Sequence, residues 1–395
     1  MGSSSADQVV QTVTSQWYNA LVDQLNLSPD QFQLAQGNVS LPGTSPELWN
    51  FLDSIPPYSV TQYWTGFGRN SFSGQYGLLV SRLQDNFGDA FKVDMGDYYP
   101  SWVAYAASND PKSYDAKGFV DRLGGWAYGN MPPEQASKCI SDFRTSLDGT
   151  IGQANTLWGA TGGPGGIKAY QGTVDDVKNK IGRALWGSVT INSNTTSSDL
   201  SRTWARGSIE GHHAGFFGKI GAEYSSATSQ LNDAGFSVTA NFTNVLILPV
   251  QPLSQGTVLA GTATYNPWYV PQALASGYNN NNYRVWYSGN PGWNSFFAPG
   301  GSLPRAVTSL VVVDGIEAIL TSNSAIASSD QQAVGASFSA GFFPFFAANG
   351  QGGWSTDHGF NAEGRITATS KCPVGSPQIL GILQSPISAL VGAAG

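Results

Sequence analysis

The chain has 395 residues, of which 41% are hydrophobic and 11% are charged, whereas a typical globular domain carries roughly 25% charged residues. The hydrophobic content excludes a disordered chain, and the length is sufficient for two domains with their own cores. A net charge of −7 provides no positive surface for nucleic acid or anionic lipid, so nucleic acid is excluded as a partner.

The first residues, Met1 to Asp7, contain no basic segment and no apolar run, so they do not resemble a secretory signal peptide. No stretch of about 18 apolar residues predicts a transmembrane helix. We therefore expect the protein to be cytoplasmic or to be released by a route other than Sec. Its two cysteines, Cys139 and Cys372, are too few for a disulfide scaffold.

Residues 1–182 have the pattern of a helical domain. Apolar residues recur at three- and four-residue spacing between Val10 and Leu25, which is typical of one helix face. A serine followed by a proline, at Ser28 and again at Ser45, predicts the start of two further helices.

Three more helices are predicted later in this half. The apolar face that begins at Phe72 predicts one, and the pattern over residues 133–158 predicts a single long one. The glycine-rich segment from Gly162 to Gly166 lacks the Lys-Ser/Thr of a phosphate-binding loop, so we interpret it as a linker. A shorter helix is predicted to begin at Val174.

The pattern changes near residue 183, where a β-rich domain spanning residues 183–395 is predicted to begin. Apolar residues alternate with Ser, Thr and Asn from Phe236 to Thr243, which is typical of a half-buried strand. We predict strands at residues 236–248 and 309–320. The fold class is therefore expected to be α+β, with a helical first half and a β-rich second half.

An internal repeat is also expected in the second half. The sequence Ala-Gly-Phe-Phe occurs at residues 214–217 and again at residues 340–343, within a similar order of strands and Ser/Gly-rich stretches. The repeat units would cover about 183–250 and 309–385 and form two similar long hairpins or half-sheets.

Residues 253–306 separate the two repeat units and are rich in aromatic residues. Trp268, Trp286 and Trp293 could stack on a sugar, since Trp rings serve as ligand platforms, or they could pack this connection onto the sheet. We favour packing and keep ligand binding as the alternative.

No catalytic motif and no cofactor site are recognisable. Glu210, His212 and His358 are the best metal candidates, but zinc sites usually need three or four ligands at sharper spacing, so we expect polar structural residues rather than a metal. A Gly-x-Ser-x-Gly elbow is absent, and neither cysteine has a nucleophile signature. The chain is therefore predicted not to be an enzyme.

The most unusual apolar segment carries Phe342, Phe343, Phe345 and Phe346 in a stretch without charge from Gln331 to Thr356. Phe216 and Phe217 occupy the equivalent place in the first unit. Charge-free stretches rich in Gly, Ser and aromatics suit a membrane-crossing β-hairpin, and they equally suit a buried core or an assembly interface. We expect these phenylalanines to make assembly or membrane contacts.

Several short motifs together resemble one family of proteins. They include Leu48-Trp49 with Ile55-Pro56-Pro57-Tyr58-Ser59 near the beginning, and Pro377-Gln378-Ile379-Leu380-Gly381 near the end. The sequence is similar in these motifs to an uncharacterised family of fungal and bacterial proteins, which carries no established activity and no functional residues. The resemblance implies that residues 45 to 383 form one evolutionary unit.

Three functions remain open on the sequence alone. The first is a self-assembling or structural protein that forms homo-oligomers through uncharged β surfaces, because low charge favours association. The second is a toxin-like protein that forms β-pores in membrane lipid. The third is a carbohydrate-binding protein that uses the tryptophans to hold a glycan. We place assembly slightly ahead of pore formation.

Overall fold

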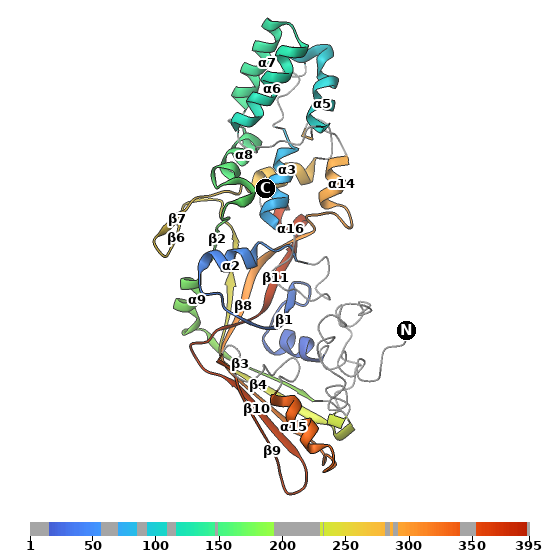
Figure 1. Ribbon diagram of the computed structural model, residues 1–395, viewed down its shortest axis with the longest axis vertical. Coiled ribbons are helices and arrows are strands. Elements are labelled where there is room, and N and C mark those ends of the chain that lie inside the picture. The colour runs from blue at the N-terminus through green and yellow to red at the C-terminus, as the bar shows by residue number, and fades with distance from the viewer. Residues whose placement is uncertain are drawn as a thin grey trace.

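The computed structural model describes residues 16–56, 70–84, 93–108, 116–146, 149–192, 230–231, 233–280, 285–286, 291–339 and 353–392. The protein is α+β, as predicted, with most helices in the first half of the chain and a large antiparallel sheet mainly in the second. Figure 1 shows an elongated molecule, with α5, α6 and α7 at one end and the β9–β10 hairpin at the other.

The helices fall into three groups along the chain. An N-terminal helix covers residues 16–24. The helices of the first half are α2 Ser45–Leu52, α3 Phe72–Ser81, η1 Gly96–Tyr98, α5 Tyr99–Ser108, α6 Ala116–Asn130, α7 Pro133–Ser146, α8 Thr150–Ala160, η2 Gly163–Gly165 and α9 Val174–Ile181. The helices of the second half are α13 Pro271–Asn279, α14 Pro291–Phe297, α15 Gln331–Ser339 and α16 Ile387–Gly392.

The main sheet has seven strands in the described residues, all in antiparallel pairs. They are β1 Phe32–Ser40, β3 Leu185–Asn192, β4 Phe236–Pro249, β8 Arg305–Ser322, β9 Ser355–Phe360, β10 Ile366–Cys372 and β11 Gln378–Pro386. Two small sheets pair β2 Tyr170–Gln171 with β5 Gln251–Pro252, and β6 Val258–Ala260 with β7 Ala263–Tyr265. The predicted strands at 236–248 and 309–320 are confirmed as β4 and β8.

The long strand β8 lies at the centre of the sheet. It pairs with β4 along one edge, and on its other edge with β11 at one end and β10 at the other. The loop between β10 and β11 is held by Asp314 of β8, whose carboxylate accepts hydrogen bonds from Gly375 N and Ser376 N at 3.0 and 3.1 Å. Gly315, the next residue of β8, has a φ of +64, a backbone conformation that glycine adopts readily.

Hydrophobic residues form three cores in the described part of the chain. One lies between the N-terminal helix, α15 and the end of the sheet nearest β9. The second joins α2, α3, α8, α9, α13, α14 and α16 to the other end of the sheet. The third lies among α5, α6 and α7 and contains Cys139, whereas Cys372 belongs to the first core, and neither cysteine is in a disulfide.

Three expectations for the first half need correction. The segment from Ser28 to Gln31 is a single turn leading into β1, because Phe32 N bonds back to Ser28 O at 2.8 Å and the next residues pair with β11. The cap of α2 is Thr44 rather than Ser45, and it forms a capping box with Glu47.

The predicted helix over 133–158 is two helices, α7 and α8. Gly149 adopts an extended conformation and serves as the N-cap of α8, which restarts the helix at Thr150. The apolar period continues across this break, so periodicity alone could not reveal it.

The first and second halves of the chain share one sheet and one core. β1 belongs to the segment that was predicted to be helical, yet it pairs with β11 near the C-terminus. The second core also mixes α2 and α3 with β8 and β11. The change of pattern near residue 183 is therefore a change of secondary structure within a continuous packing unit, and the division into domains at 182/183 stays a prediction.

Candidate functional site

Two long antiparallel units lie side by side in the sheet, and both end at the same row of residues paired across the strands. The first consists of β3 and β4, and the second of β8 with β10 and β11. Asn192 pairs with Ser237, Ser237 with Thr321, and Thr321 with Thr367. The connections at 193–235 and 323–365 therefore both start and end at this row, with 43 residues each. The second connection returns to the sheet at Ser355, where β9 begins and pairs with β10.

The sheet near this row has one apolar and one polar face. The residues of the buried face include Val189, Val238, Ala240, Leu320 and Ala368, all of which are at most 2% exposed. The opposite face is lined by hydroxyl groups, with bonds from Ser237 to Thr321 at 2.9 Å and from Thr190 to Thr239 at 3.1 Å. An ion pair between Lys371 and Glu317 adds its two charges there, at 2.7 Å.

Two helices cover the apolar face. The N-terminal helix contributes Trp17 and Leu21 to this core, and α15 contributes Val334 and Phe338. Helix α15 lies within the second connection, so the segment that links β8 to β10 packs back onto the strands from which it departs.

Helix α15 meets strand β9 at a glycine. The ring of His358 on β9 stacks near Phe338, with ring centroids 6.5 Å apart. A Cβ atom added at Gly335 would lie 2.5 Å from His358 Nε2, so a larger residue here would require the His358 ring or the helix to shift. Gly335 and Phe338 of α15 therefore both lie next to His358 of β9.

Most of the site residues predicted from sequence lie outside the described residues. These are Glu210, His212, Phe216, Phe217, Phe342, Phe343, Phe345 and Phe346. His358 is described, and no cluster of three His, Cys, Asp or Glu residues that could hold a metal occurs in the described part of the chain. The proposed equivalence of Phe216 and Phe342 therefore stays a prediction.

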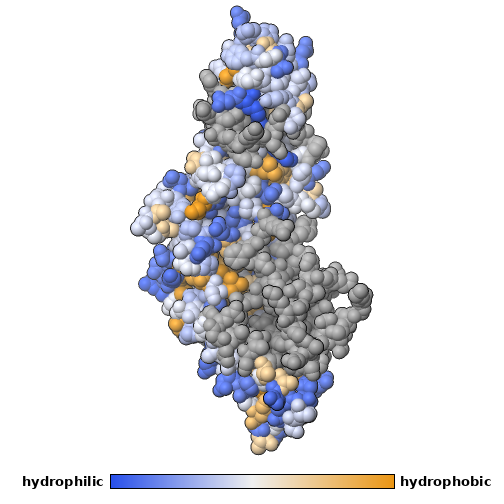
Figure 2. Space-filling view, in the orientation of Figure 1, coloured by the Kyte–Doolittle hydropathy of each residue, from blue (hydrophilic) through white to orange (hydrophobic). Residues whose placement is uncertain are grey.

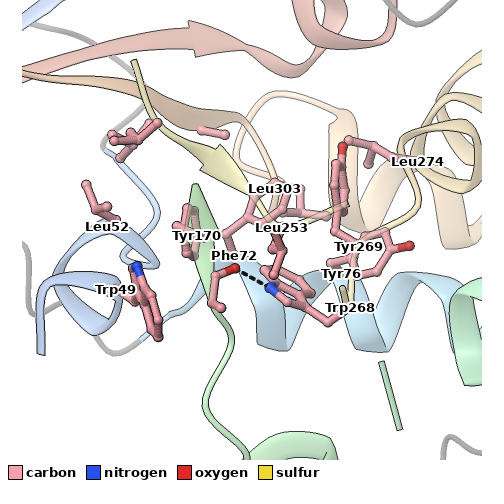
Figure 3. Close-up of a cluster of buried hydrophobic side chains, with 14 of the residues drawn as sticks. Trp49, Leu52, Phe72, Tyr76, Tyr170, Leu253, Trp268, Tyr269, Leu274 and Leu303 are labelled. Atoms are coloured by element: carbon pink, nitrogen blue, oxygen red, sulfur yellow. Dashed lines mark hydrogen bonds between the residues drawn. The ribbon is translucent and has the colours of Figure 1, made fainter. Parts of the chain in front are cut away.

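Trp268 and Trp286 are core residues, as the favoured packing interpretation expects. Both are fully buried. Trp268 donates from Nε1 to Ala169 O at 2.6 Å and lies among the rings of Tyr76 and Tyr170 (Figure 3). Trp293 is half-buried and donates to Tyr278 O at 2.7 Å. The packing interpretation therefore fits this aromatic segment.

A buried carboxylate joins the helices to this aromatic cluster. Asp53, at the end of α2, accepts hydrogen bonds from Ser73 Oγ at 2.6 Å, from Ser73 N at 2.9 Å and from Tyr170 Oη at 2.8 Å. Burial raises the pKa of Asp53, against the opposing effect of these hydrogen bonds. Burial also lowers the pKa of the neighbouring Lys168 to about 8, partly offset by Asp53.

The raised pKa of Asp53 predicts a pH effect on stability. The folded protein binds this proton more tightly than the unfolded chain, so the contribution of Asp53 should increase as pH falls through the raised pKa and level off below the unfolded value near 3.8. Urea unfolding of the wild type and of Asp53→Asn, measured from pH 7 to pH 4, should show the wild type gaining relative to the variant. A relative loss would mean that the hydrogen bonds outweigh burial.

The surface is polar but sparsely charged. On the face drawn in Figure 2, the described residues are mostly hydrophilic or neutral, and hydrophobic residues form small separate patches. Among the described helices, none is both long enough and apolar enough to cross a bilayer. Large exposed hydrophobic residues include Leu185 and Trp186 at the start of β3, which are 81% and 76% exposed.

Comparison with known proteins gives no relative: no family model matches the chain, and neither the curated proteins nor the solved structures contain a match.

Sequence reasoning missed the polar contacts that hold the sheet. Asp314 bonds to residues about 60 positions later, and Gln24 bonds to Thr190 across 166 positions. No local pattern marks either residue, because each partner is brought close only by the fold.

Proposed function

We propose that this protein assembles into oligomers and inserts its two sheet connections into a membrane as β-hairpins. The row formed by Asn192, Ser237, Thr321 and Thr367 carries the proposal. Two antiparallel units whose connecting segments begin at one end of a sheet can extend in the same direction, strand by strand. The proposal assigns no catalytic residue and no cofactor.

The length of each connection supports this function. A strand that crosses a bilayer needs about 9–11 residues, so a hairpin needs about 20 residues and a turn. The segment 193–235 has 43 residues, and the segment 323–354, which precedes β9, has 32, so each is long enough for one such hairpin. The second connection carries no charge from Gln331 to Thr356, which lowers the cost of placing it in lipid.

The two faces of the sheet support it as well. Strands of a membrane barrel alternate between an apolar residue that faces lipid and a polar residue that faces the lumen. Near the row, β4 alternates Val238 and Ala240 with Thr239 and Asn241. Hairpins extended from these strands would begin in a sheet that already has one apolar and one hydroxyl-lined face.

Assembly follows from the number of strands. The smallest membrane barrels have eight strands, whereas two hairpins provide four. A pore therefore requires several copies of the chain, which joins the assembly and pore-forming hypotheses. The carbohydrate-binding alternative has less support, because two of its three candidate tryptophans, Trp268 and Trp286, are fully buried.

Dye release from phosphatidylcholine vesicles tests the proposal. The wild type should release the dye and form rings or arcs on vesicles in negative-stain images. The variant Phe345→Ser with Phe346→Ser should lose release by about tenfold or more, because each buried ring contributes about 2–3 kcal/mol, while its melting temperature changes little.

The control is Leu259→Ser with Val374→Ser, which removes two exposed apolar side chains elsewhere. It should release dye as the wild type does. If the wild type releases no dye and forms no assemblies on vesicles, the proposal is wrong. If the double phenylalanine variant simply unfolds, the two phenylalanines are ordinary core residues and do not contact the membrane.

A further inference from the structure

Strand β3 is an edge strand whose outer side is partly closed by a glutamine side chain. In the described residues, β3 pairs with β4 alone. Gln24 Nε2 donates to Thr190 O at 3.0 Å, and Thr190 N donates to Gln24 Oε1 at 3.0 Å. One primary amide thus makes the two hydrogen bonds that a neighbouring strand would make with Thr190.

The geometry of the N-terminal helix places Gln24 at this edge. Asn26 adopts φ 53°, and Leu27 N bonds back to Val22 O at 2.9 Å, which ends the helix directly after Gln24. Tyr18, on the buried side of the same helix, donates to Phe32 O at 2.8 Å. The helix is therefore anchored in the core while its last residue reaches the strand.

A second contact fixes the helix end against β3. A Cβ atom at Gly187 would lie 2.8 Å from Leu25 Cδ2, so the absence of a side chain at Gly187 lets Leu25 lie across the strand. Beyond this point, Leu185 and Trp186 are uncovered, at 81% and 76% exposed. A strand edge without a partner strand in the described residues, beside two large exposed apolar side chains, favours association.

We propose that Gln24 is a clasp: its two side-chain hydrogen bonds to Thr190 keep a second copy of this chain from pairing with β3 until an incoming strand displaces them. This inference rests on the proposed function, in which several copies must join. The occupant is a second copy because, in the described residues, its own sheet ends on the side away from β3 in the edge of β9 or, once β9 has left, of β10. Contacts between such different edges of identical chains generate rings where the rotation closes. Gln24 is itself exposed, so an incoming strand can displace its amide.

The hydrogen bonds of Gln24 and the ability of β3 to pair with another strand can be removed separately, by different substitutions. Gln24→Ala removes both hydrogen bonds and leaves Thr190 free to pair with another chain. Thr190→Pro removes the outward N–H without removing a backbone hydrogen bond to β4, since that N–H bonds to Gln24. It also removes the hydroxyl that bonds Thr239, so Thr190→Val, which loses only that hydroxyl, is measured beside it. Gln272→Ala, on the exposed side of α13, is a matched control.

Sedimentation velocity without lipid measures the result. Gln24→Ala should self-associate at about tenfold lower concentration than the wild type, because two exposed amide hydrogen bonds no longer compete. Adding Thr190→Pro to the same chain should abolish this association, and Gln272→Ala should behave as the wild type. If Gln24→Ala loosens the helix, Gln24→Glu, which keeps the side-chain length but loses the donor, should associate in the same way.

Two results would overturn the clasp. One is that both Gln24 variants sediment as the wild type does. The other is that association persists in the presence of Thr190→Pro, which would place the contact elsewhere. If either result is found and the wild type still releases dye, the proposed membrane function stands without the clasp. If the wild type releases no dye but the Gln24 variants associate as expected, the membrane function alone is rejected.

Discussion

Replacement of Trp268 with alanine is expected to lower the free energy of unfolding by about 3–5 kcal/mol, the range for removing a buried tryptophan ring from a core. The ring is fully buried and lies among Phe72, Tyr76, Tyr170 and Tyr269. The same change leaves Ala169 O without its hydrogen bond from the indole. Chemical denaturation at neutral pH measures the loss.

Trp186→Ala is the matched control for this change. That ring is 76% exposed, so its removal should change the free energy of unfolding by less than about 0.5 kcal/mol. Comparable losses for Trp186 and Trp268 would contradict the packing described for the aromatic segment. A glycan that bound the wild type but not a stably folded Trp268 variant would restore the carbohydrate-binding hypothesis.

Gly335→Val is expected to increase the rate of dye release from vesicles by about tenfold. Its first side-chain atom would lie 2.5 Å from His358 Nε2 and 2.9 Å from His358 Cδ2, and overpacking of this kind costs about 1–3 kcal/mol. Because α15 must leave the sheet before the second connection can extend, weakening its contact with β9 should accelerate insertion. Each 1.4 kcal/mol corresponds to about a tenfold change.

Two further variants make this prediction specific. Gly359→Val, on the same strand β9, should behave as the wild type, because a Cβ atom there meets nothing within 4 Å. Adding His358→Ala to Gly335→Val should return the rate toward that of the wild type, because the obstructing ring is gone. If hydrogen exchange shows that α15 has loosened while dye release is unchanged, extension of this connection is not part of the function.

The sequence predicted those elements in which buried and exposed positions recur at a regular spacing. Alternation of apolar and hydroxyl residues identified β4, because one face of that strand is buried and the other is polar along most of its length. Strand β1 was not predicted, because its partner β11 lies more than 300 residues away and its own residues lack a clear period of two. The break at Gly149 was missed because the apolar period continues through it.

The candidate site was predictable only in part. Low charge and the two similar units pointed to the sheet and its connections, but their common exit row depends on how β4 pairs with β8, which no local pattern specifies. The contacts of Gln24 with Thr190 and of Gly335 with His358 join separate elements through single atoms. Such contacts depend on the relative placement of elements, so they emerge only from the folded chain.

The order of strands at the end of the sheet limits how copies could join. In the described residues, β3, β4, β8, β10 and β9 lie side by side and alternate in direction, so the two outermost strands run the same way. If copies were related by rotation about an axis along the strands, β3 of one copy would lie parallel to β9 of the next. A sheet that stays antiparallel around a ring needs an even number of strands from each copy. The departure of β9, which belongs to the second connection, would leave four strands and make that symmetry attainable.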